Sequence, residues 1–494
     1  MKYVLALDQG TTSSRAIIYD ETLAVKGVGQ YSFEQIYPQP GWVEHDPEKI
    51  WQTVQNAIAD ALTDAKIDAA EITAIGITNQ RETIVVWDKR SGAPIANAIV
   101  WQDRRTADTC HRLKAQGLET DISEKTGLLL DPYFSATKIQ WLLDEHQGAR
   151  GAAERGELIC GTIDSWLVWK LSEGASHVIE ASNASRTLLL DIASCTWDQQ
   201  LLDTFSIPRE MLPRVVASSG NIAEATVAPF SGVPITGIAG DQQAALFGQT
   251  CFSVGEAKCT YGTGCFLLTN TGNQVVRSTS RLLSTVAWSI DEQVTYALEG
   301  SVFIGGALIQ WLRDNLSLVE HASEIEALAD SVPDNGGVTL VPAFAGLGAP
   351  HWDPEARGTL LGITRGTSKG HIARAALEGI AMQVTDVVEA MSQDLGAPLA
   401  RMKVDGGASA NNLLLQMQAD FSGLQVSRAS NLESTALGAA SLAGLGAKVW
   451  SDTATLQTLW QNDSDFNPAL EPPLVNRARQ TWLRAIERAG QWSS

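Results

Sequence analysis

The sequence predicts an α/β protein built from two large domains. Its 494 residues exceed the about 250–300 residues at which a single hydrophobic core stops growing. Apolar strand-like segments alternate with segments of helical periodicity, which is typical of sheets covered by helices. A strand, a turn rich in glycine and threonine, and a second strand occur near the start of each half. We place the boundary near residue 250, which gives domains of residues 1–250 and 251–494.

The first half begins with apolar segments at residues 3–7 and 15–20, and the polar turn between them predicts a β-hairpin. Asp46 followed by Pro47 indicates a helix start, because aspartate caps helices and proline suits the first helical position. Two further strands are expected at 75–78 and 83–87, separated by the sequence Asn-Gln-Arg-Glu.

The second half begins in a similar way, with strands expected at 257–261 and 265–269 around Gly262-Thr263-Gly264. A helix over 372–395, a strand over 401–404 and a helix from Asn411 onward are expected next. The chain ends in an amphipathic segment that contains Trp482, Leu483 and Ile486. We expect this segment to be a helix that packs against the rest of the protein and takes no part in the chemistry.

The composition limits partners and compartment. A formal net charge of −20 argues against nucleic acid or an anionic membrane as the main partner, because both attract basic surfaces. The six cysteines form no CxxC pair, so reduced thiols are expected. No basic leader and no long apolar segment is present, so we expect a cytoplasmic protein without membrane insertion.

Both turns are candidates for binding phosphate. Successive backbone N–H groups and hydroxyls, such as those of Thr11, Thr12 and Ser13, can point at one phosphate group. Either turn alone is better explained as an ordinary hairpin, but the pair favours a nucleotide held between two lobes. Asp8 lies beside the first turn, where a carboxylate would repel phosphate unless Mg²⁺ bridges them. No GxxxxGK[ST] or strand-linked GxGxxG sequence offers another nucleotide site.

Other polar residues at predicted strand ends leave alternatives open. Asp241 follows an apolar strand and is either a helix cap or a general base for phosphoryl transfer. Arg81 and Glu82 are either an exposed ion pair at a hairpin tip or a donor and acceptor for neighbouring hydroxyls. Trp101 and Tyr133 either cover a small carbon skeleton or belong to the core.

Eight segments in consistent order resemble the FGGY carbohydrate kinases. They are LALDQGTTSSRAIIYD (5–20), PGWVEHDPEKIW (40–51), NQRET (79–83), WQDRRT (101–106), GIAGDQQAALFGQ (237–249), TYGTGCF (260–266), ALEGS (297–301) and VDGGASANN (404–412). The resemblance implies a two-lobed, actin-like ATPase fold of the ribonuclease-H-like type, with ATP and substrate in the cleft between the lobes. Residues of the first lobe would hold the substrate, and the second lobe would bind most of the nucleotide.

The resemblance also implies a nucleotide site. ATP phosphates would contact Thr11, Thr12, Ser13, Arg15 and Thr263, the nucleotide site would include Gly306 and Gln310, and the adenosine part would contact Gly407 and Asn411. Mg²⁺ would lie near Asp8 and Asp241.

The NQRE and GDQQ segments resemble those of family members that phosphorylate glycerol. The resemblance implies glycerol contacts from Arg81, Glu82, Tyr133, Asp241 and Gln242, with Trp101 and Phe266 against the carbon chain. Asp241 would be the general base, and the product would be sn-glycerol 3-phosphate. A homodimer or homotetramer is also implied.

Two rival functions stay open: a kinase of the same family that acts on another polyol or a ketose, and an actin-like ATPase without a small-molecule substrate. One segment departs from the family pattern. Residues 225–232 lack the loop with glycine and arginine by which some bacterial relatives bind fructose 1,6-bisphosphate, so inhibition through that loop is not expected.

Overall fold

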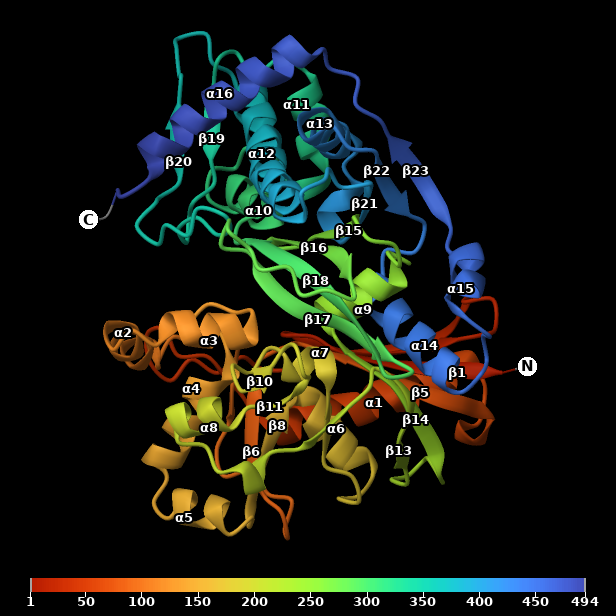
Figure 1. Cartoon of the computed structure of the whole chain (residues 1–494). Helices are drawn as coiled ribbons and strands as arrows, with labels where there is room; N and C mark the ends of the chain where they lie inside the picture. The colour runs from red at the N-terminus through yellow and green to blue at the C-terminus, as the bar shows by residue number, and fades with distance from the viewer. Residues whose placement is uncertain (1, 493–494) are drawn as a thin grey trace.

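Two large β-sheets form the body of the protein, and helices α9 (Asp241–Gly248) and α14 (Ser434–Gly446) lie between them (Figure 1). This computed structural model describes residues 2–492. In order across the sheet, the first contains β13 (Ser219–Ala225), β14 (Val233–Gly240), β5 (Ile72–Asn79), β1 (Tyr3–Gln9), β2 (Ser13–Tyr19) and β3 (Val25–Ser32). The second contains β17 (Leu283–Ile290), β18 (Gln293–Val302), β16 (Cys265–Gly272), β15 (Glu256–Tyr261), β21 (Arg401–Asp405), β22 (Val426–Ala429) and β23 (Asn462–Phe466).

Five strands of each sheet have the same topology. In the first sheet β1, β2 and β3 are antiparallel neighbours, and β5 and β14 follow parallel to β1. In the second sheet β15, β16 and β18 are antiparallel neighbours, and β21 and β22 follow parallel to β15. The similarity that the sequence shows only around the two turns is therefore part of a repeated unit of five strands.

The predicted helices and the hairpins predicted at residues 3–20 and 257–269 are confirmed. The hairpins β1–β2 and β15–β16 form as expected, and Asp46 caps α1 by accepting hydrogen bonds from the backbone N–H groups of Glu48 and Lys49. Helices besides α9 and α14 are α1 (Pro47–Ala65), α2 (Ala107–Ala115), α3 (Glu119–Thr126), α4 (Ser135–Glu145), α5 (Ala149–Glu154), α6 (Ile163–Leu171), α7 (Ala181–Ala184), α8 (Gln199–Phe205), α10 (Gly306–Asp314), α11 (Ile325–Asp330), α12 (Lys369–Leu395), α13 (Asn412–Ser422), α15 (Thr453–Leu459) and α16 (Pro472–Ala489). Within residues 2–492, no helix has the length and apolar character that crossing a membrane requires.

A third sheet corrects the prediction for residues 75–87. It contains β4 (Glu44–His45), β7 (Ala98–Ile99), β6 (Ile84–Asp88) and β8 (Leu158–Thr162), whereas β5 belongs to the first large sheet. Residues 80–83 are therefore a link between two sheets and not a hairpin tip. Two-stranded sheets complete the described fold: β9 (Val178–Glu180) with β12 (Arg214–Val216), β10 (Leu190–Asp191) with β11 (Thr196–Trp197), and β19 (Thr339–Val341) with β20 (Thr359–Leu361).

The C-terminal helix α16 packs as expected. Trp482 is buried and Ile486 packs against the core of the second half, but Leu483 is 47% exposed. Trp482 and Ile486 lie four positions apart on one helix face, and Leu483 is turned about 100° from Trp482. Leu483 therefore lies on the exposed face of a helix that packs as expected.

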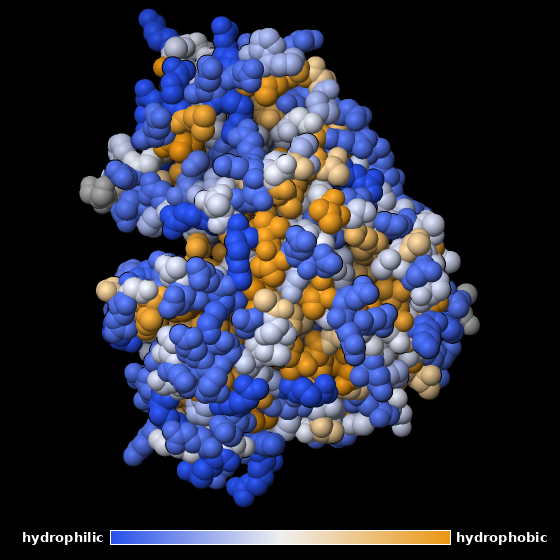
Figure 2. Space-filling view, in the orientation of Figure 1, coloured by the Kyte–Doolittle hydropathy of each residue, from blue (hydrophilic) through white to orange (hydrophobic). Residues whose placement is uncertain are grey.

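Helix α14 comes from the second half of the chain but packs against β1, β5 and β14 of the first sheet. Its alanines share one apolar core with Val4 and Ala6 of the first sheet and Leu268 of the second. The two halves therefore meet in a common core. Figure 2 shows the surface hollowed on the opposite side, between the part that carries α16 and the part that carries α2 and α3.

Glycines make this close packing possible. A Cβ on Gly438 would lie 1.8 Å from the carbonyl oxygen of Ala244 in α9, and one on Gly248 would lie 2.1 Å from the carbonyl oxygen of Ser434. A Cβ on Gly76 of β5 would lie 2.2 Å from the carbonyl oxygen of Ala439. Backbone atoms cannot yield as a side chain can, so a methyl group at these positions must push the elements apart.

We therefore expect Gly438→Ala to destabilise the protein by about 3 kcal/mol, although alanine favours an isolated helix by about 1 kcal/mol. Differential scanning calorimetry measures the change. Gly366→Ala is the matched control, because a Cβ at Gly366 meets nothing closer than 3.8 Å. An unchanged melting temperature for Gly438→Ala would contradict the contact between α9 and α14.

Candidate active site

Three parallel strands of the first sheet bring the candidate residues to one edge. Strands β1, β5 and β14 run side by side, with Asp8 opposite Thr78 and Asn79 opposite Gly240. Carboxyl ends of parallel strands meet at the same edge, which is where open α/β sheets bind ligands. Asp8, the link at residues 80–83 and Asp241 therefore lie close together.

Asp241 is paired with Arg81. Its Oδ1 lies 3.1 Å from Arg81 Nε and accepts a hydrogen bond of 2.7 Å from the backbone N–H of Gln242, while 28% of its side chain is exposed. Gly240 holds the cap position of α9 and Asp241 is the first helical residue, so the helix-cap alternative for Asp241 is wrong. A Cβ on Gly240 would come within 2.8 Å of the Arg81 side chain, so glycine at this position lets the guanidinium pass.

Arg81 and Glu82 are buried, so the alternative of an exposed ion pair is wrong. Glu82 has a φ of 59°, an unusual conformation for a residue other than glycine and one that functional sites often hold. Its backbone carbonyl accepts a hydrogen bond from Ser135 Oγ, and its carboxylate receives one of 2.6 Å from Arg186 Nε. Burial raises the pKa of Glu82, although Arg186 and Arg81 oppose the rise.

Two residues that the sequence analysis did not single out as site residues complete this cluster. Glu299 on β18 accepts hydrogen bonds of 2.5 and 2.9 Å from the two terminal nitrogens of Arg81, and one of 3.1 Å from Arg186. A glutamate within the buried run of β18 is a signal that could have indicated it, because buried carboxylates need partners. Arg186 follows a short helix and carries no comparable signal.

Trp101 and Tyr133 lie beside this cluster and are half-buried, and Tyr133 also packs against an apolar core of the first half. Their rings meet edge to face with centroids 5.6 Å apart. The indole N–H of Trp101 donates a hydrogen bond of 3.1 Å to the Thr11 hydroxyl. These aromatic residues therefore connect the cluster to the first turn.

Gln242 and Phe266 approach from the direction of the second sheet. The side-chain carbonyl of Gln242 accepts a hydrogen bond from Lys258 Nζ, which also donates one of 3.0 Å to the Thr260 hydroxyl. Phe266 is half-buried and lies opposite Thr260 in the β15–β16 ladder. Lys258 is a third buried charged residue missed from the sequence, and burial lowers its pKa.

Asp8 and Asp241 are the carboxylates predicted to lie near a metal. Burial raises the pKa of Asp8 to about 7, the nearby Arg15 opposes the rise, and the Asp241 carboxylate adds to it. The residues described contain no set of three His, Cys, Asp or Glu side chains that could hold a metal by themselves. Two carboxylates nevertheless suit Mg²⁺, which binds through one or two carboxylates together with substrate phosphates.

The first turn presents its hydroxyls at the surface. Thr12 is exposed, while Thr11 and Ser13 are half-buried, and the Gly10 N–H closes the turn on the Ser13 carbonyl at 2.9 Å. Arg15 forms an ion pair with Glu433, which directly precedes α14. The guanidinium predicted to meet phosphate is therefore held by a carboxylate of the second half.

The second turn is packed against two other predicted nucleotide residues. The Gly306 N–H donates a hydrogen bond of 2.8 Å to the Gly262 carbonyl, and a Cβ on Gly306 would lie 3.8 Å from that of Ala408. Thr263 is exposed, and so are Gln310 on α10 and Gly407 after β21. The structure therefore brings Thr263, Gly306 and Gly407 together.

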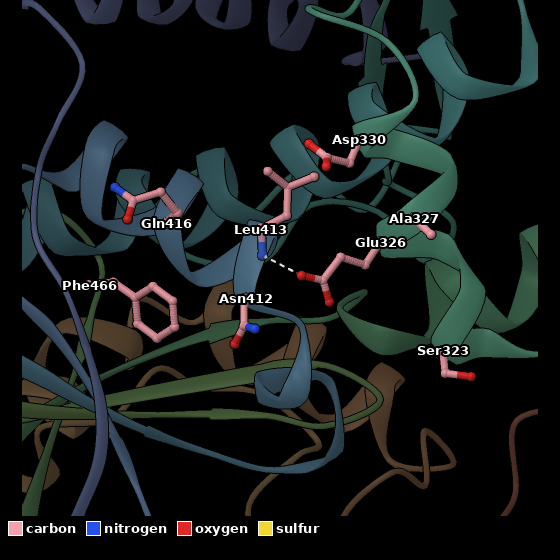
Figure 3. A pocket seen from close by; sticks show the side chains of 8 residues that line it. All are labelled: Ser323, Glu326, Ala327, Asp330, Asn412, Leu413, Gln416 and Phe466. Atoms are coloured by element: carbon pink, nitrogen blue, oxygen red, sulfur yellow. Dashed lines mark hydrogen bonds between the residues drawn. The ribbon is translucent and has the colours of Figure 1, made fainter.

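Asn411 lies beyond this group and caps α13 through a hydrogen bond of 2.8 Å from the Leu414 N–H. Figure 3 shows the adjoining pocket of about 520 Å³ between α11 and α13. Asn412, Leu413 and Phe466 line one side, and Glu326 faces them, accepting a hydrogen bond of 3.2 Å from the Leu413 N–H. The pocket therefore lies next to Asn411, one of the residues predicted to contact the adenosine part.

Comparison with known proteins shows the family of the chain. Family models for the N-terminal and C-terminal domains of the FGGY family of carbohydrate kinases match residues 3–248 and 257–447. The chain belongs to the FGGY family of carbohydrate kinases. It is 58% identical to the glycerol kinase of Trichlorobacter lovleyi over 494 residues, which is 100% of each chain. It is 56% identical to that of Carboxydothermus hydrogenoformans over 493 residues, with 99% of each chain covered.

A solved structure supports the fold. Plasmodium falciparum glycerol kinase with ADP matches with a TM-score of 0.94 and 36% identity, covering 99% of this chain and 98% of that one. The predicted two-lobed, actin-like ATPase fold is therefore confirmed. As a member of the FGGY family, the protein is a kinase.

Proposed function

We propose that this protein uses ATP to phosphorylate a terminal hydroxyl of glycerol, giving sn-glycerol 3-phosphate. The observation that carries the proposal is the pairing of Asp241 with Arg81 at 3.1 Å, at the edge where β1, β5 and β14 end. A partly exposed carboxylate held beside a buried guanidinium can accept a proton from a hydroxyl that the guanidinium orients. The names of the whole-length relatives support glycerol as the substrate.

The proposed glycerol site joins polar and apolar groups. Arg81 donates to the hydroxyls, Glu82 accepts from them, and Gln242 and Tyr133 add one polar group each. Trp101 and Phe266 would contact the carbon chain. Arg81, Glu82 and Asp241 follow the ends of neighbouring parallel strands, which supports the proposal that a small triol meets several of these groups at once.

The proposed nucleotide site runs from the first turn, in the first half of the chain, across the second half. Thr11, Thr12, Ser13, Arg15 and Thr263 would hold the phosphates, with Gly306, Gln310, Gly407 and Asn411 along the rest of the nucleotide. Mg²⁺ near Asp8 and Asp241 would neutralise charge on the phosphate oxygens. The pocket beside Asn412 and Leu413 has room for a base.

In-line transfer would depend mainly on positioning. Asp241 would take the proton from the attacking hydroxyl, and approach of the two lobes would exclude water from the phosphoryl group. A cytoplasmic location and a homodimer or homotetramer are proposed with the function, from the family resemblance.

A kinase assay across glycerol, dihydroxyacetone, xylulose and gluconate tests the substrate. We expect the kcat/KM for glycerol to exceed that for the other compounds by at least about tenfold. Faster turnover of a sugar would refute glycerol as the substrate and would indicate another substrate of the family. ATP hydrolysis without a phosphorylated product would support an actin-like ATPase.

We expect Asp241→Asn to lower kcat for glycerol by about 10²–10⁴-fold, the usual contribution of a general base, because the amide cannot accept the proton. The melting temperature should change little, since asparagine retains the side-chain oxygen that accepts from Gln242. Steady-state kinetics and calorimetry measure both effects. Asp452→Asn is the control, because Asp452 caps the distant helix α15 and asparagine caps as well. Wild-type turnover by Asp241→Asn would refute the base assignment.

We expect Glu433→Gln to lower the KM for ATP by up to about fivefold, because Arg15 then no longer has to leave a carboxylate to meet phosphate. The side chains are 22% and 50% exposed, so solvent screens the pair and the effect stays modest. Glu157→Gln, which breaks a surface pair with Arg155, is the control. A raised KM for ATP in Glu433→Gln alone would mean that Glu433 holds Arg15 in its binding position.

A further inference from the structure

Five side chains with alternating charge connect the two ends of the proposed glycerol site. Asp241 Oδ1 lies 3.1 Å from Arg81 Nε. Glu299 accepts hydrogen bonds of 2.5 and 2.9 Å from Arg81 and one of 3.1 Å from Arg186. Arg186 in turn donates a hydrogen bond of 2.6 Å to Glu82. We call this series the charge chain. Its two ends, Asp241 and Glu82, are the acidic residues of the proposed site.

Glu299 lies at the centre of the charge chain and is its only member from the second half of the protein. It is located on β18, opposite Leu268 of β16, within the second large sheet. Its side chain is fully buried, as is that of Arg186, and that of Arg81 is 2% exposed. A single carboxylate from one sheet therefore fixes two guanidiniums that belong to the other half.

The charge of Glu299 is retained despite burial. Burial by itself raises the pKa of a carboxyl group, but the guanidiniums of Arg186 and Arg81 lower the pKa of Glu299 to about 2. Removing one partner from a buried charge pair leaves the other uncompensated in a poorly polar surrounding. Without Glu299, Arg81 and Arg186 would lose their shared counter-ion and would repel each other.

Arg186 has few other partners to hold it. Its Nη1 is buried and has no hydrogen-bond partner among the described residues, and its guanidinium lies 5.6 and 5.3 Å from the ring centroids of Tyr133 and Phe134. Glu82 and Glu299 therefore determine where it lies. Arg81 Nε also lies 4.0 Å from Glu82 Oε1, and Arg81 donates a hydrogen bond of 3.3 Å to one neutral acceptor among the described residues, Gln243 Oε1.

We infer that Glu299 is a positioning residue for the substrate site, which holds Arg81 directly, and Glu82 through Arg186, in the arrangement that receives glycerol hydroxyls. The inference rests on the proposed function, because it assigns Arg81 and Glu82 to the substrate. If Glu299 lost its charge, Arg81 would pair more strongly with Asp241, and Glu82 would be the remaining carboxylate partner of Arg186. Both carboxylates would then be less available to the substrate, while the nucleotide side would be unaffected.

The test is Glu299→Gln, which keeps the size of the side chain and one acceptor oxygen but removes the charge. We expect the KM for glycerol to rise at least about tenfold, with the KM for ATP within about twofold of wild type. Glycerol should also lose its ability to raise the melting temperature, whereas ADP should still raise it, since a ligand stabilises only the fold it binds. This thermal shift does not depend on turnover.

Glu256→Gln is the matched control. Glu256 lies in the same sheet, its side chain is 9% exposed, and it receives hydrogen bonds of 3.0 and 2.7 Å from Arg401. We expect it to lower the melting temperature without changing either KM. If Glu299→Gln behaves in the same way, or raises both KM values equally, the positioning role is overturned.

A second variant covers a failure of Glu299→Gln to fold. Glu299→Asp keeps the charge, but its shorter side chain cannot reach both guanidiniums at once, so a smaller rise in the KM for glycerol alone is expected. An unchanged KM for glycerol in Glu299→Asp would overturn the inference. Wild-type protein that does not phosphorylate glycerol would refute the proposed function instead, which separates the two failures.

Discussion

The close contact between α9 and α14 is the constraint on which the rest of the structure depends. Each helix follows the outer parallel strand of a repeated five-strand unit, and the two pack where glycine leaves room for the backbone. Because Asp241 begins α9 and Glu433 precedes α14, this contact also fixes where two charged residues lie. A small change in the separation of the helices would move both residues together.

Charged side chains buried where the two halves of the chain meet are a second constraint on the structure. Arg81 and Arg186 from the first half require a carboxylate, and Glu299 of the second half supplies it. Burying such a cluster of ion pairs costs free energy of desolvation, and the cluster is stable only when the hydrogen bonds between its members have good geometry. The two sheets must therefore meet in one arrangement for the cluster to be satisfied, which links the fold of the whole chain to the site.

Much of this could be predicted from the sequence because the signals are local. The Asp46 cap, the two hairpins and the strand before Asp241 depend on neighbouring residues, and the consistent order of short motifs indicated the family resemblance. The partners of Arg81 could not be predicted, since Glu299 is 218 positions away along the chain. The link at residues 80–83 looked like a hairpin because sheet membership is decided by tertiary packing and not by the local pattern.

The two sides of the site differ in how far they are organised in advance. Arg81, Glu82 and Arg186 are buried and fixed by several hydrogen bonds, so a small ligand that meets them causes little further loss of side-chain freedom. Thr12, Thr263 and Gln310 are exposed and lie on different elements. Groups of this second kind gain fixed positions only by contact with a ligand that spans them. In the proposed site, a long, charged nucleotide would provide that contact at many points, whereas a three-carbon substrate would not, which favours a rigid charged cluster on the side of the smaller molecule.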